Sequence, residues 1–438
     1  MVAATQRPAS ADPTKISPRV IMAGAVGSVI EYFDFGVYGY VATILAVQFF
    51  ASDDPVAALL STLATFAVAF VLRPLGALLF GYYGDRFGRK NALAATIILM
   101  AAASGLIGVL PSYYAIGLWA TILLVMARIM QGLAAGGELG GAASFVAEKS
   151  PNHRRGMYTS TTQMGALAGS LLASLTVMIL NLALGTEAMQ DWGWRIPFII
   201  AIPLGLFGLW IRNGLEESEE FEAAKKAAQE LKEKQQPVRT LFTKYPGKVI
   251  QVVGLSILLF SAYYIAYVYM NIHMQTVLGF DPDFAYLSTT LTLLVSVIAM
   301  PFFGLLADKV GRKKVFIGAS IAGILLAVPA FMLVEVGGPV AVITHIVFGL
   351  VDSALMGVAL STFAEMFPTP VRYTGIAFGF SVGASLAGGT SPYIANWLVD
   401  ATGNHLAPAF FMIGTGVITL IAAIFLKETK GISLQEVE

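Results

Sequence analysis

The chain contains the stretch Gly81-Tyr-Tyr-Gly-Asp85-Arg86-Phe-Gly88-Arg89-Lys90, and its pattern returns as Gly304-Leu-Leu-Ala-Asp308-Lys309-Val-Gly311-Arg312-Lys313. Both copies fit G-x-x-x-D-[RK]-x-G-R-K, and each follows a long apolar stretch. Glycine lets two helix backbones approach closely, and an aspartate at a helix end can meet the N-terminus of a neighbouring helix. The repeated motif therefore predicts a conformational contact between helices; the alternative is a pair of basic anchors that only fix topology.

A second repeated set lies farther along each half of the chain. Glu148, Pro151 and Arg155 recur in the same order and spacing as Glu365, Pro368 and Arg372. Repeats of this kind indicate two homologous halves fused by a linker. We expect the four charged residues, Glu148, Arg155, Glu365 and Arg372, to form a network between the halves.

The composition places the chain in a membrane. Of its 438 residues 57% are hydrophobic and 12% are charged, and the mean hydropathy is +0.74. Soluble proteins keep roughly a quarter of their residues charged. The net charge of zero gives no attraction to nucleic acid, the chain has no cysteine, and its four histidines show no metal-ligand spacing.

A helix needs about 20 apolar residues to cross the hydrocarbon layer. Twelve such stretches occur, near residues 19–50, 56–82, 91–110, 113–147, 154–184, 192–213, 247–278, 283–307, 314–334, 339–366, 371–399 and 405–426. They are predicted to be helices, because a backbone in lipid must satisfy its own hydrogen bonds and no period-2 alternation of the barrel type is present. The predicted fold is an all-α membrane protein with twelve transmembrane helices in two six-helix halves.

Lysine and arginine fix the direction of insertion. Of the 27 basic residues, Arg195 alone falls in an outer loop if both termini are cytoplasmic, and Arg73 and Arg128 fall inside spans. This asymmetry predicts a multi-pass protein of the cytoplasmic (inner) membrane with both termini inside. The expected parts are a tail at 1–18, a half at 19–213, a linker at 214–246, a half at 247–426 and a tail at 427–438.

The doubled loop resembles the signature of the major facilitator superfamily. Further stretches are similar to its metabolite:H+ symporter family: Glu31-Tyr-Phe-Asp34-Phe-Gly36, Arg73-Pro-Leu-Gly76, Arg128-Ile-Met-Gln131-Gly132 and Trp192-Gly-Trp-Arg195. The resemblance implies a porter of a small metabolite, in a family whose members carry proline and betaine, α-ketoglutarate, citrate or shikimate. The stretch LWIRNGLEESEEFE looks most like the shikimate branch.

Ionisable residues inside spans are costly and point to function. Glu31 and Asp34 share one face of the first span, about 18 and 22 Å along the helix from Arg19 at 1.5 Å per residue. Two carboxylates so close and poorly solvated are not expected to be ionised together. One of them is therefore a candidate proton carrier.

The resemblance to the related sugar porters implies that Asp34 of the first span pairs with Arg128 of the fourth. We expect Asp34 to bind the coupling proton, with Arg128 alternating between this carboxylate and the solute. Glu31 and Glu138 are expected to share the proton or contact the solute, and a static pair that only locks two helices remains the alternative. Arg73 is interpreted as a residue that extends toward the headgroups.

Residues expected to line the solute site come from both halves. Besides Arg128 and Glu31 they are Tyr263, Tyr267, Gln163, His345, Asp352 and Asn396. Tyrosines offer ring faces and hydroxyls to a solute, although such stripes commonly serve packing. His345 and Asp352 are seven residues apart on one helix face and are expected to pair.

The sequence thus predicts a proton-coupled symporter of a small organic acid, working by alternating access. The alternatives are a symporter of a zwitterion such as betaine or proline, an uncoupled facilitator or exchanger, and a non-transporting membrane sensor. No nucleophile–base or metal-ligand set indicates an enzyme, and no cofactor is expected besides the proton. The expected partners are the solute and membrane lipid, and the expected oligomeric state is a monomer.

Overall fold

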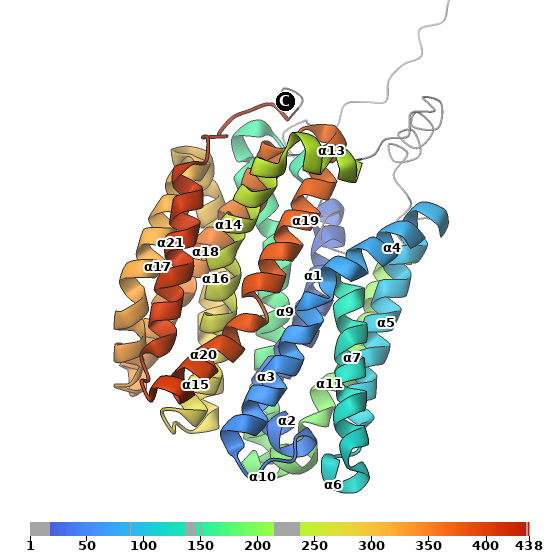
Figure 1. Cartoon of the computed structure of the whole chain (residues 1–438), viewed down its shortest axis with the longest axis vertical. Helices are drawn as coiled ribbons and strands as arrows, with labels where there is room; N and C mark the ends of the chain where they lie inside the picture. The colour runs from blue at the N-terminus through green and yellow to red at the C-terminus, as the bar shows by residue number, and fades with distance from the viewer. Residues whose placement is uncertain are drawn as a thin grey trace, which may run out of the picture.

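The computed structural model of this chain describes residues 18–87, 89–136, 146–148, 150–213, 237–434 and 437. Every regular element in these ranges is helical. The helices stand side by side in two bundles, one from each half of the chain (Figure 1). We call the end of the molecule that carries α13 and the C-terminus the upper end, and the opposite end the lower end.

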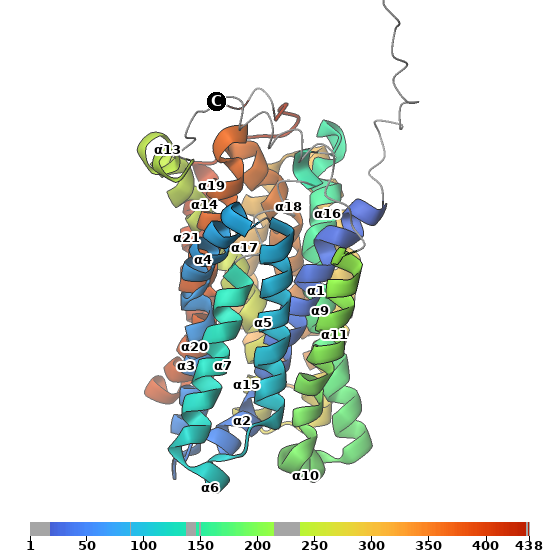
Figure 2. The same cartoon turned by 90° about the vertical axis from the view of Figure 1, so that its right-hand side faces the viewer.

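The first bundle contains the helices up to Asn213. They are α1 Pro18–Tyr40, α2 Ala42–Phe49, α3 Pro55–Val71, α4 Arg73–Phe87, α5 Arg89–Val109, α6 Tyr113–Ile116, α7 Leu118–Gly136, η1 Asn152–Arg154, α9 Arg155–Leu184, α10 Thr186–Ala188, the π-helical η2 Met189–Gly193 and α11 Arg195–Asn213. Figure 2 shows α5, α7 and α11 on the outer side of this bundle.

The second bundle begins after the linker, of which residues 214–236 lie outside the described ranges. Its helices are α13 Pro237–Lys244, α14 Pro246–Tyr264, the π-helical η3 Ile265–Tyr269, α15 Met270–Thr276, α16 Pro282–Val310, α17 Arg312–Val334, α18 Gly338–Met366, α19 Thr369–Ala387, α20 Thr390–Thr402 and α21 Ala407–Ile424.

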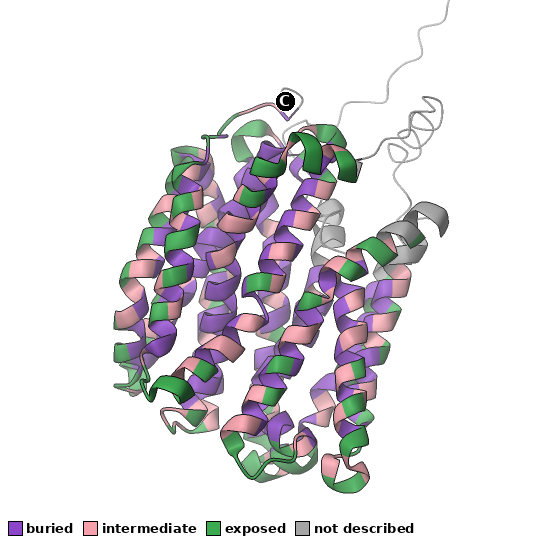
Figure 3. Ribbon diagram, in the orientation of Figure 1, coloured by how far each residue is buried: buried purple, intermediate pink, exposed green. Residues whose placement is uncertain are grey.

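Length and apolar composition allow eight of the described helices to cross a membrane, or ten if two bent helix pairs count as one span each. Adding α5, which is apolar over Ala94–Val109, and the α19–α20 pair gives twelve crossing segments, six in each bundle. Exposed residues lie mainly on the outward-facing parts of the helices, and buried residues lie mainly where helices face one another (Figure 3). The chain is an all-α, twelve-span membrane protein, as the sequence predicted.

Several spans that the sequence predicts as continuous are broken. The first bends by 65° at Val41, and the fourth is interrupted at Gly117, which adopts a positive φ of 61°. The eleventh breaks at Gly388 and Gly389. A Cβ at Gly389 would lie 2.2 Å from the ring of Phe70, so this break lets α3 of the other half pack against the backbone. Apolar composition alone does not encode such breaks.

The two bundles meet along α9 and α16. Gly156 and Gly304 face each other at the upper end, where a Cβ on either would come within 2.6 Å of the carbonyl oxygen of the other. Lower down, the hydroxyls of Ser174 and Thr290 are 2.8 Å apart. The first glycine of the second motif copy therefore serves close contact between the halves, as the sequence predicted for this residue type.

The bundles also touch at the lower end. Asn181 of α9 donates to Asp283 of α16 at 2.6 Å, and the Tyr286 hydroxyl donates to the carbonyl of Tyr40 at 3.2 Å. A Cβ at Gly39 would lie 2.8 Å from the side chain of Val268. With contacts at both ends, the side chains midway between the bundles are shielded from solvent.

Candidate functional site

Asp34 lies midway along α1 with its carboxylate turned into the first bundle. Ser104 of α5 donates to one carboxylate oxygen, and Gln131 of α7 donates to the other at 2.6 Å. Asp34 is 1% exposed. Two neutral donors, one from α5 and one from α7, therefore hold the buried carboxylate of α1, and its charge depends on these partners.

Arg128 reaches Asp34 through Gln131. Its Nη1 donates to the Gln131 side-chain oxygen at 2.8 Å, while the amide nitrogen of the same Gln131 contacts Asp34. Its Nη2 donates to the carbonyl of Phe66 at 3.3 Å. In this closed state, in which the two bundles touch at both ends, Asp34 and Arg128 do not form the direct pair that the resemblance implied. The Gln131 amide connects them instead, and we call Asp34, Gln131 and Arg128 the relay.

Gln131 and Ser104 are functional candidates that the sequence pattern did not indicate. The spacing of Arg128 and Gln131, three residues apart on a helix, was the available signal, because such residues lie on the same face. Ser104 carried no distinguishing pattern. A serine within an apolar span is common and commonly bonds to its own helix, as Ser104 also does to the carbonyl of Met100 at 2.9 Å.

Glu31, one turn before Asp34, forms an ion pair with Arg73 of α4. The Glu31 Oε1 and Arg73 Nη2 atoms are 2.9 Å apart, and the two side chains are 1% and 0% exposed. The Arg73 guanidinium lies 4.6 Å from the ring centre of Phe35 and 4.4 Å from that of Phe70. Arg73 is therefore buried against a carboxylate, and the interpretation that it extends toward the headgroups was wrong.

Aromatic rings surround both arginines. The Arg128 guanidinium lies 4.3 Å from the ring centre of Tyr38, 4.8 Å from that of Phe35 and 5.0 Å from that of Phe66. Contacts with ring faces are favourable for a cation but remain weaker than a saturated set of hydrogen bonds. Each arginine thus keeps part of its donor capacity free for a change of partner.

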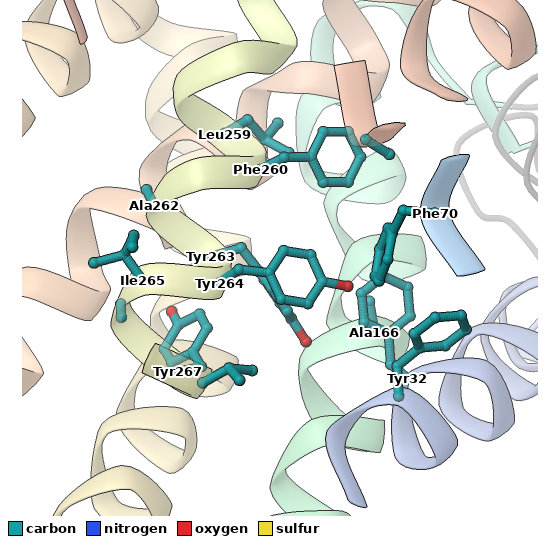
Figure 4. Packing of buried hydrophobic residues seen from close by; sticks show 14 of the residues in the cluster. Tyr32, Phe70, Ala166, Leu259, Phe260, Ala262, Tyr263, Tyr264, Ile265 and Tyr267 are labelled. Carbon is teal, nitrogen blue, oxygen red and sulfur yellow. The ribbon is translucent and has the colours of Figure 1, made fainter. Parts of the chain in front are cut away.

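The tyrosines of α14 and η3 meet these rings from the other half. The ring of Tyr264 lies 5.0 Å from that of Phe70 and 5.7 Å from that of Phe66. The Tyr263 ring lies 5.4 Å from Tyr32 of α1 and 5.1 Å from Tyr267. Figure 4 shows Tyr263 and Tyr264 projecting from the second bundle toward Tyr32 and Phe70. We call Tyr32, Tyr263, Tyr264 and Tyr267 the tyrosine cluster.

His345 and Asp352, both on α18, do not pair. The His345 ring is held by the Ser288 hydroxyl at 2.9 Å and by the Ala266 carbonyl at 2.6 Å. Asp352 is fully buried, and its two carboxylate oxygens accept no hydrogen bond from the described residues. It lies instead against Tyr267, whose hydroxyl donates to the Gly349 carbonyl at 2.9 Å. The expected His345–Asp352 pair is therefore absent, because the neutral oxygens of Ser288 and Ala266 satisfy both ring nitrogens.

The other expected solute residues stand apart from these contacts. Gln163 on α9 is buried, and its amide nitrogen has no hydrogen-bond partner among the described residues. Asn396 on α20 is also buried. The prediction for Glu138 falls on a residue outside the described ranges. In the part of the chain that the structure describes, no group of three or more histidine or acidic residues could hold a metal ion.

The second motif copy builds a polar network at the upper end. Asp308 accepts hydrogen bonds from the backbone nitrogens of Gly156 and Met157, both at 2.9 Å, and pairs with Arg312 at 2.8 Å. It thus caps the N-terminus of α9 from the other half of the chain. This is the contact that the motif predicted for its aspartate.

The charged residues of the other repeat complete this network. Arg155 pairs with Glu365 at 2.8 Å, and Arg372 pairs with Glu148 at 2.8 Å, each linking one half to the other. Arg312 also contacts Glu365, at 3.1 Å. Of the first motif copy, Gly81 lies in α4, but Gly88 and the side chains of Asp85, Arg86 and Arg89 lie outside what the structure describes.

The C-terminal segment after α21 closes over the same network. Glu428 accepts from the backbone nitrogen of Arg312 at 2.8 Å, and Thr429 donates to Glu365 at 2.6 Å. The carbonyl of Leu434 accepts from Arg372 at 2.8 Å. Gly311, with a positive φ of 109°, leaves no room for a Cβ, which would lie 2.3 Å from the Glu428 carboxylate.

Comparison with known proteins gives the family. The family described as "Sugar (and other) transporter" matches residues 20–237 and residues 209–438. The proline/betaine transporter of Escherichia coli strain K12 is 38% identical over 422 residues, which are 94% of this chain and 83% of that protein. The chain belongs to this family of membrane transporters, within the major facilitator superfamily.

Two further relatives and one solved structure agree with this. A glycine betaine/proline/ectoine/pipecolic acid transporter of Dickeya dadantii is 38% identical over 94% of this chain and 83% of that protein. A putative proline/betaine transporter of Staphylococcus aureus strain COL is 36% identical over 96% and 91%, respectively. The proton:xylose symporter XylE bound to 6-bromo-6-deoxy-D-glucose has the same fold, with a TM-score of 0.74 at 21% identity, covering 95% of this chain and 97% of that one.

These names do not support the organic acid that the sequence favoured, and they agree better with the zwitterion alternative. The resemblance of one linker stretch to the shikimate branch was a local similarity, whereas the relatives match over almost the whole transporter. Solute preference is set by side chains from several helices, so a short stretch after the sixth span carries little of it.

Proposed function

We propose that this transporter is a proton-coupled symporter of a small zwitterion of the proline and betaine class, and that it works by alternating access. The observation that carries the proposal is the tyrosine cluster, which packs against the aromatic rings that surround the two buried arginines of the first half. Ring faces attract a quaternary or secondary ammonium group, and a guanidinium binds a carboxylate through paired donors. The names of the relatives support the same class of solute.

The relay of Asp34, Gln131 and Arg128 supports the coupling to protons. While Asp34 is ionised, it and the Gln131 amide occupy Arg128. A proton on Asp34 removes the negative charge that opposes Arg128, and the guanidinium then turns to the carboxylate of the solute. Proton and solute bind together in this scheme, and the empty carrier restores the relay before it returns.

The contacts at the upper end support the alternating movement. The halves are joined there by the Asp308 cap and two ion pairs, which must break for the upper side to open. Because basic residues gather at this end, we propose that it faces the cytoplasm, with both termini inside the inner membrane. All the residues proposed to bind the proton and the solute come from one chain, which supports our proposal that the monomer transports.

Counterflow in liposomes tests the solute class. Purified protein is reconstituted into vesicles loaded with proline, glycine betaine, shikimate, α-ketoglutarate or a neutral polyol, and uptake of the labelled solute is followed. We expect exchange of proline or glycine betaine and none of α-ketoglutarate. Exchange of carboxylic acids without exchange of either zwitterion would overturn the proposal.

An imposed pH gradient, acidic outside, tests the coupling in the same vesicles. We expect accumulation of the zwitterion above its equilibrium level, and its collapse when a protonophore is added. Exchange that never exceeds equilibrium would instead favour the uncoupled facilitator.

A further inference from the structure

The three acids that the structure describes at the buried centre, Glu31, Asp34 and Asp352, differ in the groups that compensate their charge. Glu31 faces Arg73 at 2.9 Å, and Asp34 has two donors and a link to Arg128. Asp352 is the exception, because it is 0% exposed and its oxygens accept no hydrogen bond from the described residues. An ionised carboxylate without a cation or donor is strongly disfavoured in a buried site. The surroundings of Asp352 therefore call for a positive partner.

The neighbours of Asp352 are neutral oxygen atoms. Tyr267 lies against it, and the neutral hydroxyls of Ser296 and Ser353 lie beside the same tyrosine. The charged groups on the helices packed around it stand at the helix ends. They are Lys248 of α14, Arg155 of α9, Asp283, Asp308 and Lys309 of α16, Arg312, Lys313 and Lys314 of α17, Glu365 of α18 and Arg372 of α19.

Glu365, the charged residue on the same helix, is thirteen positions from Asp352, or about 20 Å along the axis at 1.5 Å per residue. It is already paired with Arg155 and Arg312. His345 is satisfied by Ser288 and Ala266. The basic side chains of these helices therefore leave the Asp352 carboxylate without a counter-charge.

Asp352 borders the tyrosine cluster on the side away from the arginines. Tyr267 touches it, and the ring of Tyr267 is followed by those of Tyr263 and Tyr32 (Figure 4). Tyr32 lies within electrostatic range of both Arg73 and Asp352. The cluster thus has cationic groups on its first-half side and an uncompensated carboxylate on its second-half side.

We propose that Asp352 binds the cationic group of the transported solute, with Tyr267 and Tyr263 presenting their rings to the same group. The inference rests on the proposed function and adds the orientation in which the solute is bound. The carboxylate of the solute points to the arginines of the first half, and its ammonium points to α18. The tyrosine rings pack against one another in this structure, and they must separate to admit the solute. Glu31, which the sequence predicted to share the proton or contact the solute, is already paired with Arg73.

Two solutes of the same shape, one with and one without a positive charge, test whether Asp352 recognises that charge. Glycine betaine and 3,3-dimethylbutanoate share a carboxylate and a trimethyl head, but only betaine carries the positive charge. The concentration of each that half-inhibits counterflow of labelled betaine is measured for the wild-type protein and for Asp352→Asn. We expect the wild type to prefer betaine, and the preference to fall by about 10-fold or more in Asp352→Asn, as expected when a buried counter-charge is lost.

Asp283→Asn is the matched control, because it removes a carboxylate of the same half at the lower end, where Asp283 binds Asn181. A shift in the equilibrium between conformations changes both affinities alike, so the ratio should stay at its wild-type value. If Asp352→Asn transports neither solute, stabilisation of the purified variant against thermal unfolding gives the same ratio. Asp352→Glu should retain a preference for betaine.

A preference for betaine that survives unchanged in Asp352→Asn overturns the inference and leaves the proposed function intact. The inference also fails if the wild type binds the two solutes equally well while transporting betaine. Failure of the wild type to transport any zwitterion would overturn the proposed function itself, so the two failures are distinguishable.

Discussion

Buried arginines occur in two places, and they are bonded differently. At the upper end, Arg312 donates through all three of its nitrogens, to Glu365 and to the Ala307 carbonyl. Arg372 likewise donates to Glu148 and to the carbonyls of Ala364, Phe367 and Leu434. At the centre, Arg73 and Arg128 lie largely against aromatic rings, and the Arg128 Nε atom has no hydrogen-bond partner among the described residues.

The difference in bonding separates arginines that stabilise one arrangement of the halves from arginines that can change their partner. Breaking a saturated network leaves several buried groups unpaired. The intact network at the upper end therefore strongly stabilises one arrangement of the halves. Arg128, held by ring faces, one amide and one carbonyl, loses fewer hydrogen bonds when it changes partner. We therefore expect mutations at the centre to alter what is carried and what drives it, and mutations at the upper end to alter how fast the halves move.

The largest effect is expected for Asp34→Asn. Asparagine keeps the shape and a hydrogen-bonding side chain but binds no coupling proton, so accumulation driven by a pH gradient should be lost, by about 100-fold or to background. Counterflow between equilibrated compartments should remain, because it needs no net proton movement. Both are measured in proteoliposomes with labelled solute.

Asp400→Asn is the control for that experiment. Asp400 is an exposed carboxylate on α20, so its loss should leave accumulation at the wild-type level. Normal gradient-driven accumulation by Asp34→Asn would remove Asp34 as the proton carrier. Loss of counterflow as well would mean that the carboxylate is needed for solute binding and not only for coupling.

A smaller effect, on rate, is expected for Asp308→Asn. The amide keeps one acceptor for the N-terminus of α9, but its NH2 group faces the second backbone donor and its charge no longer pairs with Arg312. A charge-assisted bond of this kind is worth about 1.5–3 kcal/mol, so the upper-closed state should lose about 10-fold or more in relative population. Turnover should fall by a similar factor or less, with the ratio of solute affinities unchanged.

Accessibility of a single cysteine measures that shift. The chain has no cysteine of its own, so Gln163→Cys can be labelled without background. Gln163 lies eight residues below Arg155 on α9, about 12 Å along the helix, and is buried in this closed state. We expect maleimide to label Gln163→Cys faster from the upper side when Asp308→Asn is also present. Equal labelling rates in the single and the double variant would reduce the motif to a topology anchor. The matching prediction for Asp85 in the first copy stays a prediction.

The sequence predicted two kinds of feature: those encoded by motifs that recur in both halves, and the helical structure that a lipid environment requires. The helical class follows from hydropathy, and the Asp308 cap of α9 follows from a motif whose chemistry admits few other contacts. The ion pairs of Arg155 with Glu365 and of Arg372 with Glu148 belong to the network between the halves that the repeated set predicted, although the repeat did not say which residue pairs with which.

The centre was less predictable, because its partners come from separate helices. Nothing in the spacing of Glu31 and Arg73 shows that α1 and α4 bring them within 2.9 Å. Helical spacing put His345 and Asp352 on one face, but the rotation of α18 and the competing oxygens of Ser288 and Ala266 decide the contact. Gln131 was visible as a neighbour of Arg128 and became meaningful only once α7 was placed beside Asp34.

The smallest effect concerns packing alone, and Gly304→Ala isolates it at the upper end. The added Cβ would lie 2.6 Å from the Gly156 carbonyl oxygen and 2.8 Å from the Ser160 hydroxyl, so α9 and α16 must move apart at this contact. Overpacking of this kind costs about 1–3 kcal/mol, here in the upper-closed state only. The expected result is a few-fold increase in Gln163→Cys labelling and a few-fold change in turnover.

Gly318→Ala on α17 is the matched substitution, because a Cβ there meets no atom within 4 Å. Alanine favours helix over glycine by about 1 kcal/mol, so this variant should unfold at the same or a slightly higher temperature and label at the wild-type rate. Solute preference should be unchanged in both variants, since neither touches the arginines or the tyrosine cluster. If Gly304→Ala labels and turns over like Gly318→Ala, close packing at the upper end does not govern the movement of the halves. The polar network would then have to control that movement alone, which the Asp308→Asn result would show independently.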